Sequence, residues 1–222
     1  MKIKVDSQLH MQRLVLGVIC GLLPICCVLF GLIGAKDAPL ETMWWHSISA
    51  TYFCNSQVWM IGSLVLASFF FATYRGYDIG DRVLTLISSI SSICIVIFPC
   101  GNAVFDRCGL FMLPTRISGT VHNISAAILF ISFAVMILTQ FTKGQNKQRN
   151  RIYYICGAVI ALAMVSQVVT TILNISWMTI VNEFFMLEAF AVAWVVKSKA
   201  HIVKSTKYAT GLTMKNNNME EP

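Results

Sequence analysis

The sequence predicts an all-α membrane protein: a bundle of six transmembrane helices with both termini in the cytoplasm. Composition is the first observation. The chain is 56% hydrophobic and 12% charged, whereas an average soluble domain carries about 25% charged residues. The second observation is a set of six long apolar runs, each close to the roughly 20 residues that cross a membrane as a helix. Lipid leaves exposed backbone without hydrogen-bond partners, so these spans must be helical.

The spans leave little room for anything else in the chain. The first run exceeds the roughly 7–15 residues of a signal-peptide core, so we expect a retained helix. Residues 1–197 then form one transmembrane domain, and 198–222 form a cytoplasmic tail that we expect to be mobile. The predicted spans are residues 14–35, 58–74, 83–99, 117–141, 152–173 and 178–196.

The distribution of basic residues is the third observation. With the N-terminus inside, only Lys36, Arg107 and Arg116 of the 17 Lys and Arg residues fall on the outer side. This positive-inside bias predicts a multi-pass protein of the cell (inner) membrane. The net charge of +7 then suits lipid headgroups. A nucleic-acid surface is not expected, because the basic residues are not interleaved with aromatic ones.

Two carboxylates, Glu183 and Glu188, are the only formal charges inside the runs. A charge at this depth is costly and indicates function. Glu183 lies about 7 Å below the outer start of the last span and Glu188 about 15 Å below it, roughly 140° apart around the helix. They therefore do not share a face. We expect Glu188 to be protonated, or hydrogen-bonded to Ser63, Ser89 or Ser92.

Other polar side chains lie at the depth of Glu183. His122 is equally deep in the fourth span, and Gln167 and Asn174 share a face of the fifth. Two interpretations stay open: hydrogen bonding between helices, or a cavity open to the outer face in which His122 and Glu183 form a coupled pair. The candidate ligand-binding residues are His46, Ser49, His122, Asn123, Gln167, Asn174 and Glu183.

The first outer loop carries aromatic residues followed by His46, Ser47 and Ser49. Aromatics at this position are typical of the membrane interface. A histidine near serines also suggests a nucleophile and base, but no orienting acid and no G-x-S-x-G turn accompany them. His46, His122 and Glu183 form a permissible zinc-ligand set, although nothing in their spacing requires a metal. We therefore expect no metal and no cofactor.

Of the eight cysteines, Cys100 and Cys108 fall close together on the predicted outer side. On an oxidising side they would close a small loop as a disulfide. Spacing alone does not fix connectivity, so a disulfide and two free thiols both stay open.

Several short motifs recur in an order that resembles a known group of proteins. They are His46-Ser47-Ile48-Ser49-Ala50-Thr51-Tyr52, Tyr74-Arg75-Gly76-Tyr77-Asp78 with Asp81, Phe98-Pro99, and His122-Asn123-Ile124-Ser125-Ala126. The pattern resembles the prokaryotic six-helix membrane proteins called domain of unknown function 998, and more loosely the Frag1/DRAM/Sfk1-like membrane proteins. The resemblance implies six helices and an outward-facing polar region around His46, Ser49 and His122. It implies no particular activity.

Three functions follow as hypotheses. The first is a non-enzymatic integral membrane protein that binds a lipid headgroup or small ligand in an outward-facing polar pocket, with membrane lipids as its partners. The second is a membrane-embedded hydrolase, with or without a metal, that uses His46, His122 and Glu183. The third is a small transporter, for which Pro24 and Pro99 are the only hints of broken helices, and no internal repeat supports it.

Overall fold

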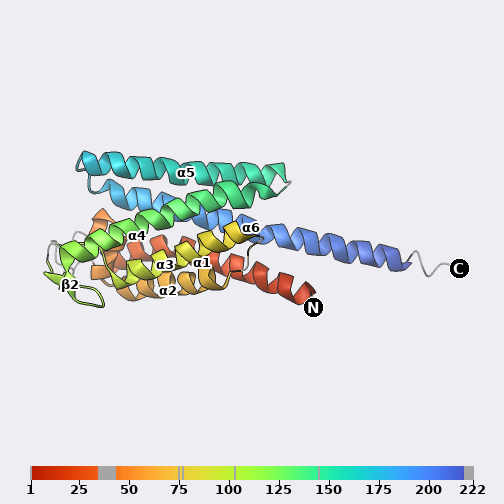
Figure 1. Ribbon diagram of the computed structural model, residues 1–222, viewed down its shortest axis with the longest axis horizontal. Helices are drawn as coiled ribbons and strands as arrows, with labels where there is room; N and C mark the ends of the chain where they lie inside the picture. The colour runs from red at the N-terminus through yellow and green to blue at the C-terminus, as the bar shows by residue number, and fades with distance from the viewer. Residues whose placement is uncertain are drawn as a thin grey trace.

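The computed structural model is an elongated bundle of six long helices (Figure 1). It describes residues 2–34, 44–74, 76, 78–102, 104–144 and 146–217; within these ranges, side chains are described for 10–33 and 45–198. The helices are α1 (Lys2–Gly34), α2 (Gln57–Thr73), α3 (Ile79–Ile97), α4 (Thr115–Val135), α5 (Lys147–Ile172) and α6 (Met178–Asn217).

Five of these helices are long and apolar enough to cross a membrane, counted over the described residues. The spans are His10–Ile33, Ile79–Ile97, Thr115–Lys143, Lys147–Ile172 and Met178–Ser198. Helix α2, with 17 residues, is apolar but shorter. The all-α prediction is confirmed, and the helices are consistent with a multi-pass membrane protein. Proline breaks no span: α1 continues through Pro24, and Pro99 follows the end of α3.

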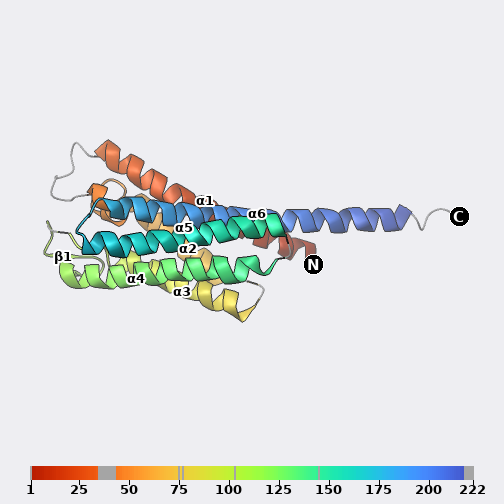
Figure 2. The ribbon, with the colours of Figure 1, turned by 90° about the horizontal axis from the view of Figure 1, so that it is seen from above.

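Helix boundaries differ from the predicted ones where polar residues cap or extend a helix. Helix α3 begins at Ile79 because Asp78 accepts a hydrogen bond from the Asp81 amide (3.0 Å). Helix α5 begins at Lys147 because Asn146 caps the Arg149 amide in the same way (3.1 Å). Helix α6 continues to Asn217, so much of the predicted tail is helical and projects beyond the bundle (Figure 2). Lys36 and Arg75, used to predict the orientation, lie outside the described residues.

After α4 the helix first widens and then tightens before the chain reaches α5. A π-helical turn, η4 (Met136–Gln140), is followed by a 3-10 turn, η5 (Phe141–Lys143). Lys143 pairs with Asp78, and this hydrogen bond holds the pKa of the Asp78 carboxyl below its usual 3.8. The pair joins the end of α4 to the start of α3.

The core is aromatic, and the helices approach closely where residues are small. Phe133 stacks on Phe190, with ring centroids 3.5 Å apart, and both contact Phe71. Helix α1 packs most extensively on α6. Gly17 lets the two helices approach closely, since a Cβ at this position would lie only 2.9 Å from the Val195 side chain. Such small residues are typical of membrane helix interfaces.

A short hairpin separates α3 from α4 at one end of the bundle, which we call the hairpin end (Figure 1). Its strands are β1 (Arg107–Cys108) and β2 (Leu113–Pro114), and Gly109 adopts a positive φ of 76° in the turn. A side chain there would meet the Ile97 carbonyl oxygen at 2.6 Å. Glycine thus lets the hairpin dock on the end of α3.

Candidate functional site

A cavity of about 1180 Å³ lies at the hairpin end. Its walls come from α4, α5 and α6, and the short turns η2 (Trp44–His46) and η3 (Ser49–Phe53) contribute to its lining. Residues from three parts of the chain, 46–50, 100–130 and 164–186, therefore meet here. All seven candidate residues line it: His46, Ser49, His122, Asn123, Gln167, Asn174 and Glu183.

Glu183 binds the η2–η3 segment. One carboxylate oxygen accepts hydrogen bonds from the Ile48 amide (2.6 Å), the Ser47 hydroxyl (3.0 Å) and the Ser49 amide (3.4 Å). The other accepts one from the Ser49 hydroxyl (3.3 Å). Consecutive backbone amides in a turn form a concave anion site of this kind. Both oxygens of Glu183 therefore hold a loop rather than a ligand.

The segment that Glu183 holds is anchored at two further points. The Thr51 hydroxyl donates to the Ile48 carbonyl (2.6 Å), which fixes the turn. The Ser56 hydroxyl donates to the Cys27 carbonyl of α1 (2.7 Å). Residues 47–56 therefore connect α1 with α6 and cover part of the cavity with a fixed backbone.

His122 contacts the end of α3 instead of the η2–η3 segment. Its Nδ1 lies 2.9 Å from the Phe98 carbonyl oxygen, which only accepts, so Nδ1 carries the proton. One turn earlier, Ser118 donates to the Pro99 carbonyl (2.8 Å). The end of α3 leaves carbonyls without helical partners, and these two α4 side chains satisfy two carbonyls beside that end. No hydrogen bond joins His122 to Glu183 in the described chain, so the coupled pair has no direct contact to support it and stays a prediction.

The side-chain amide of Gln167 is fully used in hydrogen bonds within α5 and to α6. Its carbonyl oxygen accepts from Asn182 of α6 (3.1 Å), and its amide nitrogen lies within bonding distance of Thr179 (3.0 Å) and Thr171 (3.3 Å). An amide nitrogen has two protons to donate, so both are used. At this residue the interhelical interpretation is the correct one.

Asn123 and Asn174 keep their side-chain amides unpaired within the described structure. Asn123 is exposed on the cavity face of α4. Asn174 has a positive φ of 56° just after α5, a conformation that asparagine tolerates better than most residues. These amides, with His46, are the candidate groups left for a ligand.

The structure adds cavity residues that were not among the candidates. Arg116, Thr120 and Ala127 lie on α4 with the candidate Asn123 between them, and all four line the cavity. Their spacing of three to four residues places them on one helix face, a signal that the sequence carried. Asp106, just before the hairpin, also lines the cavity; its position follows from the loop conformation, which no periodicity indicates.

Cys100 and Cys108 are free thiols in the structure, so the disulfide left open by the sequence is not formed. The pKa of the Cys100 thiol is raised from 9.0 to about 12, chiefly by burial and then by the nearby Glu183 and Cys108. Cys100 lines the cavity and stays a neutral thiol at physiological pH.

The described side chains are not arranged as the hydrolase and metal hypotheses require. His46 makes no hydrogen bond to Ser47 or Ser49 within the described residues, and both hydroxyls donate to Glu183. No group of three His, Cys, Asp or Glu side chains is arranged to hold a metal in that same part of the chain. The zinc set of His46, His122 and Glu183 is therefore not assembled.

Glu188 lies away from the cavity and faces α1, where a Cβ on Gly21 would be 3.7 Å from its Oε2. Its Oε1 is buried without a hydrogen-bond partner among the described residues. The expected bonds to Ser63, Ser89 or Ser92 are not formed. Ser89 instead exchanges hydrogen bonds with Ser68 (3.0 Å), which joins α2 to α3.

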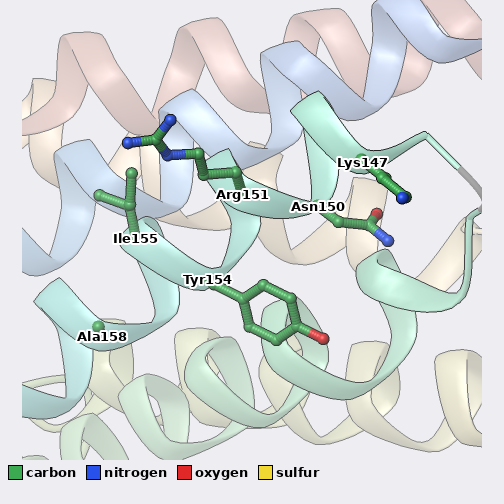
Figure 3. A pocket seen from close by; sticks show the side chains of 6 residues that line it. All are labelled: Lys147, Asn150, Arg151, Tyr154, Ile155 and Ala158. Carbon is green, nitrogen blue, oxygen red and sulfur yellow. The ribbon is translucent and has the colours of Figure 1, made fainter.

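A second hollow of about 530 Å³ lies at the opposite end of the bundle, on one face of α5 (Figure 3). Its side chains spread outward rather than converge, so it offers no site comparable to the cavity. Its lining residues are Lys147, Asn150, Arg151, Tyr154, Ile155 and Ala158.

Comparison of the chain with protein-family models, curated proteins and solved structures gave no match. The resemblance to domain of unknown function 998 therefore stays a prediction, and the site rests on its own geometry.

Proposed function

We propose that the chain is a six-span protein of the cell (inner) membrane, with both termini cytoplasmic, that binds a lipid headgroup or small ligand in the cavity at the hairpin end. In this arrangement the shorter α2 also crosses the membrane, in addition to the five longer helices, and the hairpin end faces outward. The basic residues support it: Lys143, Lys147, Arg149 and Arg151 gather at the opposite end, as the positive-inside rule requires.

The observation that carries the binding proposal is the cavity itself. At about 1180 Å³ it is at least as large as typical small-molecule pockets of about 300–1000 Å³. Its polar groups come from turns and helices that other hydrogen bonds hold in place, such as the Glu183 contacts to residues 47–49. Binding to such a preformed site costs little ordering entropy.

Filling the cavity tests this function. Ala127→Phe places a large ring on the exposed α4 face that lines the cavity, while Ala161→Phe makes the same change on an exposed part of α5 outside it. We expect the wild type and Ala161→Phe to co-purify with a bound lipid or small molecule, detected by mass spectrometry, and Ala127→Phe to lose it. Equal retention by all three proteins would refute the proposal.

A further inference from the structure

We propose that the ligand is a lipid with an uncharged, hydroxyl-rich headgroup, of the glycosyl diacylglycerol class, which enters between α4 and α5. This inference rests on the proposed function and specifies its ligand. Three observations carry it: the groups left free in the cavity, the charge of its lining, and the side on which it opens.

Apart from His46, Asp106 and Arg116, the free polar groups are amides and hydroxyls. Glu183 and Gln167 are engaged as described, which leaves the amides of Asn123 and Asn174 and the Ser176 hydroxyl on the cavity wall. Amides and hydroxyls both donate and accept. Sugar hydroxyls do the same, so several bonds of each polarity form without burying a charge.

The charge of the lining disfavours an anionic headgroup. Of the described lining residues, Arg116 is the only lysine or arginine, and Asp106 and Glu183 are acidic. Recognition of a phosphate typically uses clustered cations or a bidentate arginine. Here a single exposed arginine shares the lining with the acidic Asp106 and Glu183, so a phosphate monoester or anionic phospholipid would find no cluster of cations.

The cavity is amphipathic, as a lipid requires. Phe130, Met164 and Met186 supply apolar surface beside the polar groups. Burying acyl methylenes on this surface is favourable by about 0.8 kcal/mol for each CH₂ removed from water. A free sugar would leave the apolar part of the cavity unused.

The walls formed by α4 and α5 also provide an entrance. The two helices diverge from their shared turn toward the hairpin end (Figure 1). Ala127 on α4 and Val168 on α5 both line the cavity, and both are exposed. Val168 keeps 60% of its surface exposed on a helix expected to face lipid. A lipid therefore reaches the cavity from within the bilayer, with its headgroup toward the outer end.

The test uses the purified full chain in a polyoxyethylene detergent, which avoids sugar-headed detergents. Binding of monoglucosyl diacylglycerol, phosphatidylglycerol and free glucose is measured by native mass spectrometry and by the shift in melting temperature. We expect the glycolipid to bind at least about tenfold more tightly than the other two, a difference of about 1.4 kcal/mol or more.

Variants locate that binding. Ala127→Phe should weaken it at least about tenfold, with Ala161→Phe unchanged. Asn123→Leu removes one neutral hydrogen-bonding group and should weaken it about fivefold, which keeps the test decisive if Ala127→Phe folds poorly. Arg116→Gln should weaken glycolipid binding less than Asn123→Leu does, because no charge on the ligand needs the arginine.

Each contrary outcome has a distinct meaning. Phosphatidylglycerol binding equally well, with loss in Ala127→Phe and Arg116→Gln, would overturn the uncharged headgroup and leave the proposed function intact. Free glucose binding as well as the glycolipid would overturn the lipid. If no probe bound in a manner sensitive to Ala127→Phe or Asn123→Leu, both the inference and the proposed function would fail.

Discussion

Glu183 illustrates how hydrogen bonds can hold a carboxyl group inside an apolar helix. Four hydrogen bonds from residues 47–49 converge on its two oxygens, so its polar atoms are satisfied despite their burial. Glu188, five residues later, accepts no hydrogen bond from any residue that the structure describes. Of the two acidic side chains of α6, Glu183 thus fixes the segment 47–49, whereas Glu188 fixes no part of the described structure.

Exchanging each carboxylate for its amide measures this difference. Glu183→Gln places an NH₂ group among donors and should lower the free energy of unfolding by about 1–3 kcal/mol. Glu188→Gln is the matched control on the same helix, and we expect a smaller effect because no hydrogen bond is lost. Thermal unfolding in detergent provides the measurement. An effect of Glu188→Gln as large as that of Glu183→Gln would contradict this role.

The Cys100 thiol gives a prediction that depends on pH. Its pKa in the fold is about 12 rather than 9.0, so between these values the folded chain keeps a proton that the unfolded chain releases. Folding stability from this group is therefore complete below pH 9 and falls as the pH rises toward 12. Because the thiolate is the reactive form, maleimide labelling of Cys100 at pH 9 should be slow in the folded protein and fast after denaturation.

Peptide mapping by mass spectrometry follows the labelling of Cys100 residue by residue. Cys100→Ser serves as the control for signal from the seven other cysteines. Equal labelling rates in folded and denatured protein would show that the thiol is not buried.

At the scale of the elements, the close approach of α4 to the segment after α3 shapes the cavity wall. A Cβ on Gly119 would lie 2.8 Å from the Gly101 backbone nitrogen, and the neighbouring Ser118 and His122 hold the Pro99 and Phe98 carbonyls. Backbone packed against backbone has little room to yield.

Replacing this glycine should therefore separate the segment from α4. We expect Gly119→Ala to lower the free energy of unfolding by about 1–3 kcal/mol. Gly62→Ala in α2 is the control, since nothing lies within 4 Å of its added methyl, and alanine there should be neutral or stabilising by up to about 1 kcal/mol. The melting temperatures of both variants measure this difference in stability. No loss on Gly119→Ala would contradict the close packing.

Sequence patterns could predict the elements and part of the site, for physical reasons. The length of the apolar runs indicates helices, and the helical rise places His122 and Glu183 at one depth, where both do line the cavity. Rotation about each helix axis was not predictable, so the sequence did not indicate that His122 contacts the Phe98 carbonyl or that Glu188 makes no bond to Ser63, Ser89 or Ser92 among the described residues. The loop contacts of Glu183 depend on the conformation of residues 47–49, which no periodic pattern encodes.

At the scale of the whole molecule, orientation is the feature to test. Phe111 is exposed in the hairpin and Gln148 is exposed near the α4–α5 turn, at opposite ends of the bundle. With both termini cytoplasmic, a membrane-impermeant thiol reagent should label Phe111→Cys in intact cells and Gln148→Cys only after permeabilisation. Wild-type cells give the background of the native cysteines. The reverse pattern would invert the orientation.

The packing of α1 on α6 has a consequence for biogenesis. Of the six long helices, α1 is synthesised before the others, whereas α6, which Gly17 contacts, is synthesised after them. Until then the small-residue face of α1 has only lipid or other helices as neighbours. The bundle therefore closes only after translation of α6, and a chain truncated before Met178 would leave that face open to chaperones and membrane proteases.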